Sequence, residues 1–182
     1  MSTVTTTSDL IDQLYLSEGK AEIVDGRIVE MSPTGDYPSS ASGLIYSSLL
    51  NYCRHFGGRA YTDNAGFLVN LPNRKSFSPD AAYYTGPRGK MKFLPEPPAF
   101  AVEVRSEDDY GPAGERQMAA KRADYFSAGT LVVWDVDVES DDVVRVYRST
   151  APDEPTIYRR GELAEAEPAV PGWKMPVDEI FE

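Results

Sequence analysis

The chain has very little cysteine and histidine, and this scarcity excludes several kinds of site. Its 182 residues include one cysteine, Cys53, and one histidine, His55. A lone cysteine cannot form an intrachain disulfide, and the two residues together cannot supply a Cys/His zinc cluster. A histidine-based catalytic triad is poorly supported for the same reason, and we expect no catalytic role for His55.

Long apolar segments are also missing. Apolar runs such as Leu131–Trp134 are far shorter than the roughly 20 residues that a membrane-spanning helix needs. The polar start of the chain, Ser2–Asp9, lacks the basic and apolar regions of a signal peptide. We therefore expect a cytoplasmic protein without membrane association.

The chain has fewer positive charges than proteins that bind nucleic acid usually have. Lys and Arg number 18 against 29 Asp and Glu, a net charge of −11, whereas binding to DNA depends on cations that neutralise phosphates. Residues 74–122 differ, because nine Lys and Arg against seven Asp and Glu give a local balance of +2 and leave −13 for the rest. Arg88, Lys90 and Lys92 lie in this stretch, where they either contact a phosphate backbone or are ordinary solvated loop charges.

Length and composition predict one domain over residues 1–182, with a helix within 1–20 and an extension over 150–182. A hydrophobic content of 41% is ordinary for a globular chain of this length. In the first part, Ser8 can cap a helix that runs to about Ser17. Asp25-Gly26 predicts a hairpin between strands 22–24 and 27–31, and a longer helix is expected from about Ser39 to Phe56.

The remainder of the chain predicts an α/β (α+β) fold around a mixed sheet. Strands are expected near 59–62, 66–71, 78–84 and 100–105, and three or four of them would form a meander. A helix at about 115–128 should precede a central strand at 131–136, buried on both faces, and an outer strand at 143–147. A strand near 156–159 and a short helix would follow. The acidic residues from Asp135 to Asp142 lack the glycine and spacing of a calcium loop and are interpreted as a polar turn.

Two carboxylates, Asp80 and Glu103, stand in sequences where a charge needs a partner. Asp80 opens an apolar stretch after Pro79, and Glu103 lies within the apolar run Phe100–Val104. The intervening 85–98 is rich in Gly and Pro, so it cannot hold a helix and favours an antiparallel strand pair that places the carboxylates side by side. Such a pair predicts a site for a hard ion such as Mg²⁺.

Cations near these carboxylates suit hydrolysis of a phosphodiester. Lys121 and Tyr125 share one face of the expected helix at i and i+4, and Arg105 shares a strand face with Glu103. A metal ion would polarise a phosphoryl oxygen, and a cation would stabilise the developing charge. Arg105 stays protonated, so it cannot act as a base but could bind phosphate.

Plainer interpretations of the same residues remain open. Asp80 could satisfy backbone donors beside Pro79, and Glu103 could form a structural salt bridge with Arg105 or Lys121. Lys121 could equally be an ordinary lysine of an amphipathic helix. Glu22 could supply a further acidic ligand or point to solvent.

Pro79-Asp80 followed by Glu103-Val104-Arg105 resembles the PD-(D/E)XK nuclease signature with Arg in its final position. A wider set of segments, in chain order, is similar to the Uma-two family of restriction-endonuclease-like proteins, over about 22–181. These segments are Glu22–Pro33, Ser78–Asp80, Val102–Ser106, Lys121–Tyr125, Trp134–Asp137 and Pro171–Pro176.

The resemblance implies a restriction-endonuclease-like fold with a central mixed sheet flanked by helices. It implies Asp80 and Glu103 as metal ligands and Lys121, from a Lys-x-x-x-Tyr pattern, as the catalytic cation; Glu22 also matches the family pattern. Relatives often carry a histidine at the start of the first long helix, where this chain has Pro38 or a neighbouring serine.

We therefore expect a DNA endonuclease that depends on Mg²⁺ or Mn²⁺. Asp80, Glu103 and the Val104 carbonyl would bind the ion, Lys121 would act on water or phosphate, and Arg105 would hold a phosphate oxygen. A homodimer is plausible, since many such enzymes cut both strands. The alternatives are a binding or regulatory module that has lost turnover, suggested by the acidity and the missing histidine, and a metal-dependent phosphodiesterase for small nucleotides.

Overall fold

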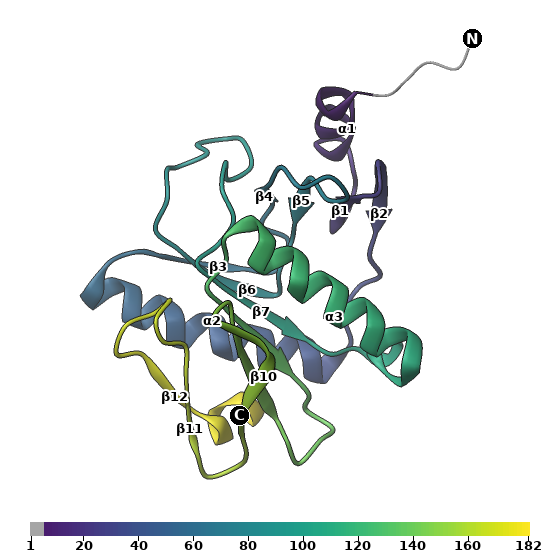
Figure 1. Cartoon of the computed structure of the whole chain (residues 1–182). Helices are drawn as coiled ribbons and strands as arrows, with labels where there is room; N and C mark the ends of the chain where they lie inside the picture. The colour runs from purple at the N-terminus through teal and green to yellow at the C-terminus, as the bar shows by residue number, and fades with distance from the viewer. Residues whose placement is uncertain (1–5) are drawn as a thin grey trace.

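A single six-stranded sheet with one long helix on each face organises the protein (Figure 1). The computed structural model describes residues 6–182; the part of the N-terminal predictions that falls on residues 1–5 lies outside the described residues. Helix α2 (Asp36–Phe56) covers one face, and helix α3 (Gly111–Ala128) covers the other. The predicted α/β fold with a mixed central sheet flanked by helices is confirmed.

The strand order of the sheet is β10-β9-β8-β7-β6-β3, and only the β7–β8 pair is parallel. Helix α3 makes the crossover between those two strands, as a parallel pair requires. The six strands are β3 (Arg59–Thr62), β6 (Ala81–Tyr84), β7 (Phe100–Val104), β8 (Val132–Val136), β9 (Val144–Arg148) and β10 (Ala151–Tyr158). The meander is therefore β3, β6 and β7, and β8 is the buried central strand that its apolar sequence predicts.

Two strand predictions need correction. The segment expected at 66–71 forms only the short β4 (Phe67–Leu68), which pairs with β5 (Ser76–Phe77) in a separate hairpin because Pro72 turns the chain back. The strand at 143–147 is not an outer strand, since β10 lies beyond β9. Strand β10 suits the edge because Pro152 and Pro155 have no N–H to donate to a further strand.

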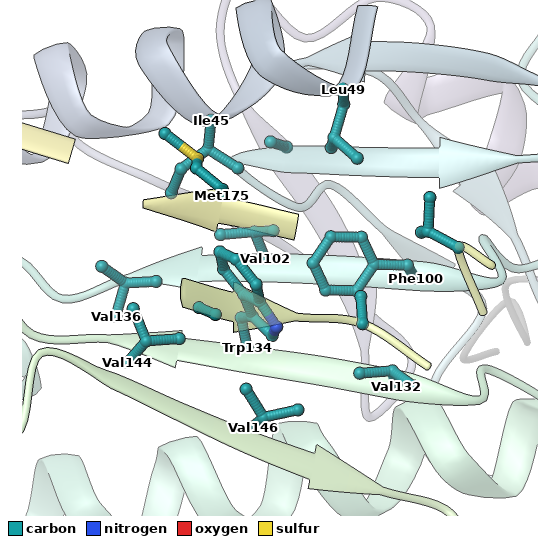
Figure 2. Packing of buried hydrophobic residues seen from close by; sticks show 14 of the residues in the cluster. Ile45, Leu49, Phe100, Val102, Val132, Trp134, Val136, Val144, Val146 and Met175 are labelled. Carbon is teal, nitrogen blue, oxygen red and sulfur yellow. The ribbon is translucent and has the colours of Figure 1, made fainter. Parts of the chain in front are cut away.

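The core on the α2 face is dense in aromatic side chains. Ile45 and Leu49 of α2 pack over Phe100, Val102 and Trp134 of the sheet, and all five are fully buried (Figure 2). The last part of the chain closes this core with three elements: β11 (Leu163–Glu165), β12 (Lys174–Pro176) and the 3₁₀ helix η2 (Val177–Phe181), which packs against α2. The expected short terminal helix is thus a 3₁₀ helix.

The N-terminal elements follow the predicted pattern with shifted boundaries. Helix α1 (Thr7–Leu14) is capped by Thr6, not Ser8, because Thr6 and Asp9 form a reciprocal capping box. Strands β1 (Ala21–Val24) and β2 (Arg27–Glu30) form the predicted hairpin, and Asp25 and Gly26 have φ of 49° and 69°, as a type I′ turn requires.

Both long helices begin earlier than predicted. Helix α2 starts at Asp36 and α3 at Gly111, and each has a proline, Pro38 or Pro112, in its first turn, where the missing N–H costs no helical hydrogen bond. The 3₁₀ turn η1 (Glu107–Asp109) leads into α3. Within residues 6–182, no helix combines the length and apolar character that crossing a membrane would require.

Candidate active site

Asp80 and Glu103 meet on the α3 face of the sheet. Asp80 directly precedes β6 and Glu103 lies on β7, and the antiparallel register pairs Ala81 with Val102. The N–H of Val104 donates to Asp80 Oδ2 at 2.7 Å, and the N–H of Asp80 donates to the Val102 carbonyl at 3.0 Å. Each acidic residue is only 9% exposed, so both carboxylates are largely shielded from water.

Lys121 reaches the same place from α3. Its Nζ lies 2.8 Å from Glu103 Oε2 and 3.0 Å from Glu22 Oε1. One turn along the helix, the Tyr125 hydroxyl donates to Glu103 Oε1 at 2.6 Å. Burial by itself lowers the pKa of Lys121, but the charges of Glu103 and Glu22 outweigh burial and raise it, so the ammonium stays charged. The structure therefore brings together three predicted site residues, Asp80, Glu103 and Lys121.

The pKa of the Glu103 carboxyl lies above its usual value. Burial raises its pKa to about 7; the Lys121 ammonium opposes that rise, and the neighbouring Asp80 carboxylate adds to it. Its two oxygens already accept from Lys121 and Tyr125. A group whose two charge states are close in free energy near neutral pH is typical of functional sites.

Glu22, on β1, is buried but points toward cations and not toward solvent. Its Oε1 accepts from the Ser78 N–H at 2.8 Å and from Lys121, and its Oε2 forms an ion pair with the Arg74 guanidinium. Burial works against ionisation, yet Lys121 and Arg74 prevail and hold the pKa of Glu22 below its usual value. In this position Glu22 fixes the location of Lys121.

Arg74 is a site residue that the sequence analysis missed. Its Nε donates to Asp124 Oδ2 at 2.8 Å, and its guanidinium lies 4.9 Å from the centre of the Phe77 ring, which stacks on Tyr125. Arg74 thus connects β1, the β5 hairpin and α3. The one signal in the sequence was indirect: a buried glutamate at position 22 needs a cation.

Lys20 was missed as well. Its Nζ lies 2.5 Å from Asp80 Oδ1 and 2.7 Å from Asp63 Oδ1. Burial by itself lowers the pKa of Lys20, but the Asp80 and Glu103 charges outweigh it and raise the pKa. Asp80 therefore has a cation of its own, separate from the Lys121 that serves Glu103.

Arg105 is engaged by other carboxylates. Its Nε and Nη2 donate to the two oxygens of Asp135 at 2.7 and 2.8 Å, and Nη1 and Nη2 donate to Glu115. The interpretation of Asp135 and Asp137 as part of a polar turn is wrong, because both are buried and Asp135 belongs to β8. Four of the five N–H groups of Arg105 are thus already engaged, which leaves one for a phosphate. The bidentate pairs join β7 to β8 and α3.

The predicted substrate-binding residues lie apart from the carboxylates. Arg88, Lys90 and Lys92 are exposed in the loop that joins the end of β6 to the start of β7, whereas Asp80 and Glu103 lie toward the opposite ends of those strands. Lys92 covers the ring of Tyr15, with 4.6 Å from Nζ to the ring centre. Val104, predicted to offer its carbonyl to a metal ion, contacts Asp80 through its N–H.

The charges of the site fit one divalent cation. Two groups of ion pairs, one around Asp80 and one around Glu103, together hold five carboxylates and three cations, which leaves a formal charge of −2. Their members are Glu22, Asp63, Asp80, Glu103 and Asp124 with Lys20, Arg74 and Lys121.

The ligand set available for such an ion is small. Within residues 6–182, no three His, Cys, Asp or Glu residues are grouped to hold a metal ion, because Glu22 is turned toward Arg74 and Lys121. Mg²⁺ commonly takes one or two carboxylates and completes its shell with water and substrate phosphates. Asp80 and Glu103 meet that requirement without Glu22.

Comparison with known proteins identifies a family and solved structures of the same fold. The model of the Uma2 family, described as putative restriction endonuclease, matches residues 9–178. No curated protein sequence matches. Among solved structures, the crystal structure of a putative nuclease belonging to DUF820 from Anabaena variabilis superposes with a TM-score of 0.73 at 16% identity, covering 94% of this chain and 97% of that one. At that identity the match shows a shared fold.

Proposed function

Because the chain belongs to the Uma2 family of putative restriction endonucleases, we propose that it is a divalent-metal-dependent endonuclease that hydrolyses phosphodiester bonds in DNA. One observation carries the proposal: Asp80 and Glu103 meet from adjoining strands, with the Lys121 ammonium 2.8 Å from Glu103. Carboxylates paired beside a fixed cation are the groups that metal-assisted phosphoryl transfer requires.

Asp80 and Glu103 would hold Mg²⁺ or Mn²⁺, with the Val104 carbonyl as a further oxygen ligand. When bound, the ion would polarise the phosphoryl oxygen and lower the pKa of a water molecule. Tyr125 orients Glu103 through its 2.6 Å hydrogen bond, and the Val104 N–H orients Asp80. These contacts fix both carboxylates before any ligand binds, which reduces the side-chain entropy that would be lost on binding.

Lys121 would stabilise the negative charge that develops on the phosphate oxygens. Its side chain is held from two sides, by Glu22 and Glu103, so the ammonium cannot swing away into solvent. Arg74 in turn holds Glu22. Glu22 and Arg74 act on the reaction through Lys121, as positioning residues, whereas Arg105 braces the strand that carries Glu103.

A plasmid-nicking assay with Mg²⁺ or Mn²⁺ tests the proposal. Asp80→Asn, Glu103→Gln and Lys121→Met should each lower the nicking rate by at least about a hundredfold, because each removes a group that acts on the transition state. Lys75→Met is the matched control, because the Lys75 ammonium donates to Asn70 Oδ1 at the surface of the molecule. Equal nicking by the wild type and all three site variants would refute the assignment.

A second candidate, a binding or regulatory module without turnover, is favoured by one specific observation. All four oxygens of Asp80 and Glu103 already accept from donors of the chain itself. Titration calorimetry with Mn²⁺ separates the two candidates: the nuclease requires binding that Asp80→Asn abolishes, and the module requires none. Hydrolysis of small nucleotides without nicking of plasmid would instead point to the phosphodiesterase alternative.

A further inference from the structure

Lys20 places an ammonium group against the carboxylate that the proposed metal ion needs. The residue directly precedes β1, and its backbone is fixed by the hydrogen bond from the Met31 N–H to its carbonyl at 2.9 Å. Its Nζ lies 2.5 Å from Asp80 Oδ1, while the other oxygen of Asp80 accepts from the Val104 N–H. The oxygen that is free of backbone contacts is therefore the one that Lys20 covers.

A second partner for Lys20 lies at the edge of the site. Asp63, in the turn after β3, has its Oδ1 2.7 Å from the same Nζ. The side chain of Lys20 is 12% exposed and that of Asp63 is 40% exposed, so the ammonium bridges an inner and an outer carboxylate. Lys20 can leave Asp80 and still keep its ion pair with Asp63, which lowers the free-energy cost of the movement.

We propose that Lys20 is the chain's own competitor for the divalent ion: its ammonium covers Asp80 when no ion is bound and withdraws to Asp63 when one binds. The inference rests on the proposed function, since it requires Asp80 to be a ligand. A monovalent cation on Asp80 and a divalent cation on the same carboxylate repel each other strongly at hydrogen-bonding distances. Lys20 thereby sets the ion concentration at which the site fills.

Lys121 does not compete in the same way. It is held by Glu22 as well as by Glu103, and Glu22 is itself fixed by Arg74 and the Ser78 N–H. When an ion takes Glu103, Lys121 keeps its inner partner and stays beside the site. The two lysines thus have different functions: Lys121 remains for the reaction, and Lys20 gives way.

Calorimetry with Mn²⁺ tests the competition. If Lys20 covers Asp80 about nine-tenths of the time, Lys20→Met should tighten Mn²⁺ binding about tenfold, because apparent affinity scales with the fraction of competent sites. Lys75→Met removes an ammonium that bonds to Asn70 at the surface and should change the affinity less than about twofold, since charges at the surface are screened. Near-ultraviolet circular dichroism verifies that each variant is folded.

Chemical labelling of the wild type tests the movement itself and needs no variant. An amine-acetylating reagent followed by peptide mass spectrometry reports how accessible each lysine is. Saturating Mn²⁺ should raise the labelling rate of Lys20 several-fold, leave that of Lys121 low and leave that of Lys75 unchanged. In Asp80→Asn, Mn²⁺ should not alter the labelling of Lys20.

The outcomes separate the inference from the proposed function. Mn²⁺ binding that depends on Asp80, with unchanged labelling of Lys20, would overturn the inference and leave the function standing. Absence of Mn²⁺ binding in both wild type and Lys20→Met would overturn both. Binding by Lys20→Met alone would support the inference, since Lys20 would then outcompete the ion in the wild type.

Discussion

Replacing Arg74 by methionine should destabilise the protein markedly, although no substrate is expected to touch this residue. Methionine keeps most of the apolar stem over Phe77 but removes the charge that faces Glu22 and Asp124. Glu22 retains the Ser78 N–H and Lys121, so the loss there is that of one buried charged hydrogen bond, about 1.5–3 kcal/mol. Asp124 is partly exposed and can be rehydrated, which adds less than about 1 kcal/mol.

The expected total for Arg74→Met is therefore about 3 kcal/mol, equivalent to a fall in melting temperature of about 6–12 °C for a chain of this size. Urea and thermal unfolding followed by circular dichroism measure it. Arg88→Met, in an exposed loop, is the control and should change stability by less than about 0.5 kcal/mol.

A double-mutant cycle isolates the pair with Glu22. In a Glu22→Gln background the Arg74 charge has lost its main partner, so Arg74→Met should cost at least about 1 kcal/mol less than in the wild type. Equal costs in the two backgrounds, or a fall of under about 2 °C in the single variant, would refute the account of Arg74 as the cation that Glu22 needs.

Three further measurements test the site, the core and the loop that carries Arg88, Lys90 and Lys92. Because burial and the Asp80 charge raise the pKa of Glu103 to about 7, a proton competes with the ion below that pH. The Mn²⁺ affinity measured by calorimetry should therefore increase with pH, by up to about tenfold per pH unit, until about pH 7 and stay constant above it. An affinity that does not change with pH would contradict this. Leu49→Ala should lower the free energy of unfolding, measured in urea, by about 2–5 kcal/mol because Leu49 is fully buried. Leu16 is exposed, so Leu16→Ala should leave that free energy almost unchanged. If Arg88, Lys90 and Lys92 contact the DNA backbone, changing all three to glutamine should make the affinity for DNA, measured by fluorescence anisotropy, less dependent on salt concentration. An unchanged dependence of the affinity on salt would identify them as ordinary surface charges.

Features that depend on neighbouring residues were predictable from the sequence. The Asp25-Gly26 turn, the Lys121 and Tyr125 spacing on one helix face and the antiparallel β6–β7 pair each follow from a local pattern or a short connection. The adjacency of Asp80 and Glu103 is a consequence of that last pair. Local rules therefore suffice for the centre of the candidate site.

Features that depend on distant segments were not predictable. Whether β9 is an edge depends on β10, whose interrupted sequence gives only a weak strand signal. Asp135 resembles one member of a polar, acidic stretch until Arg105 is known to face it across the sheet. The sequence requires that each buried charge have a partner, but any of several cations could supply it.

Lys20 and Arg74 show how this uncertainty bears on function. Three buried carboxylates at Glu22, Asp80 and Glu103 would oppose folding if they were uncompensated, so cations from distant segments are first a requirement of the fold. An ion that binds Asp80 and Glu103 must share these carboxylates with Lys20 and Lys121 or displace the lysines. Stability of the free protein and affinity for an ion would then be opposed, because a cation that compensates Asp80 or Glu103 in the free fold weakens the binding of an ion to the same carboxylate. Lys20 lies between an inner carboxylate, Asp80, and an outer one, Asp63, and so reconciles stability with affinity for the ion. It compensates Asp80 in the free protein and retains Asp63 as a partner when it moves away.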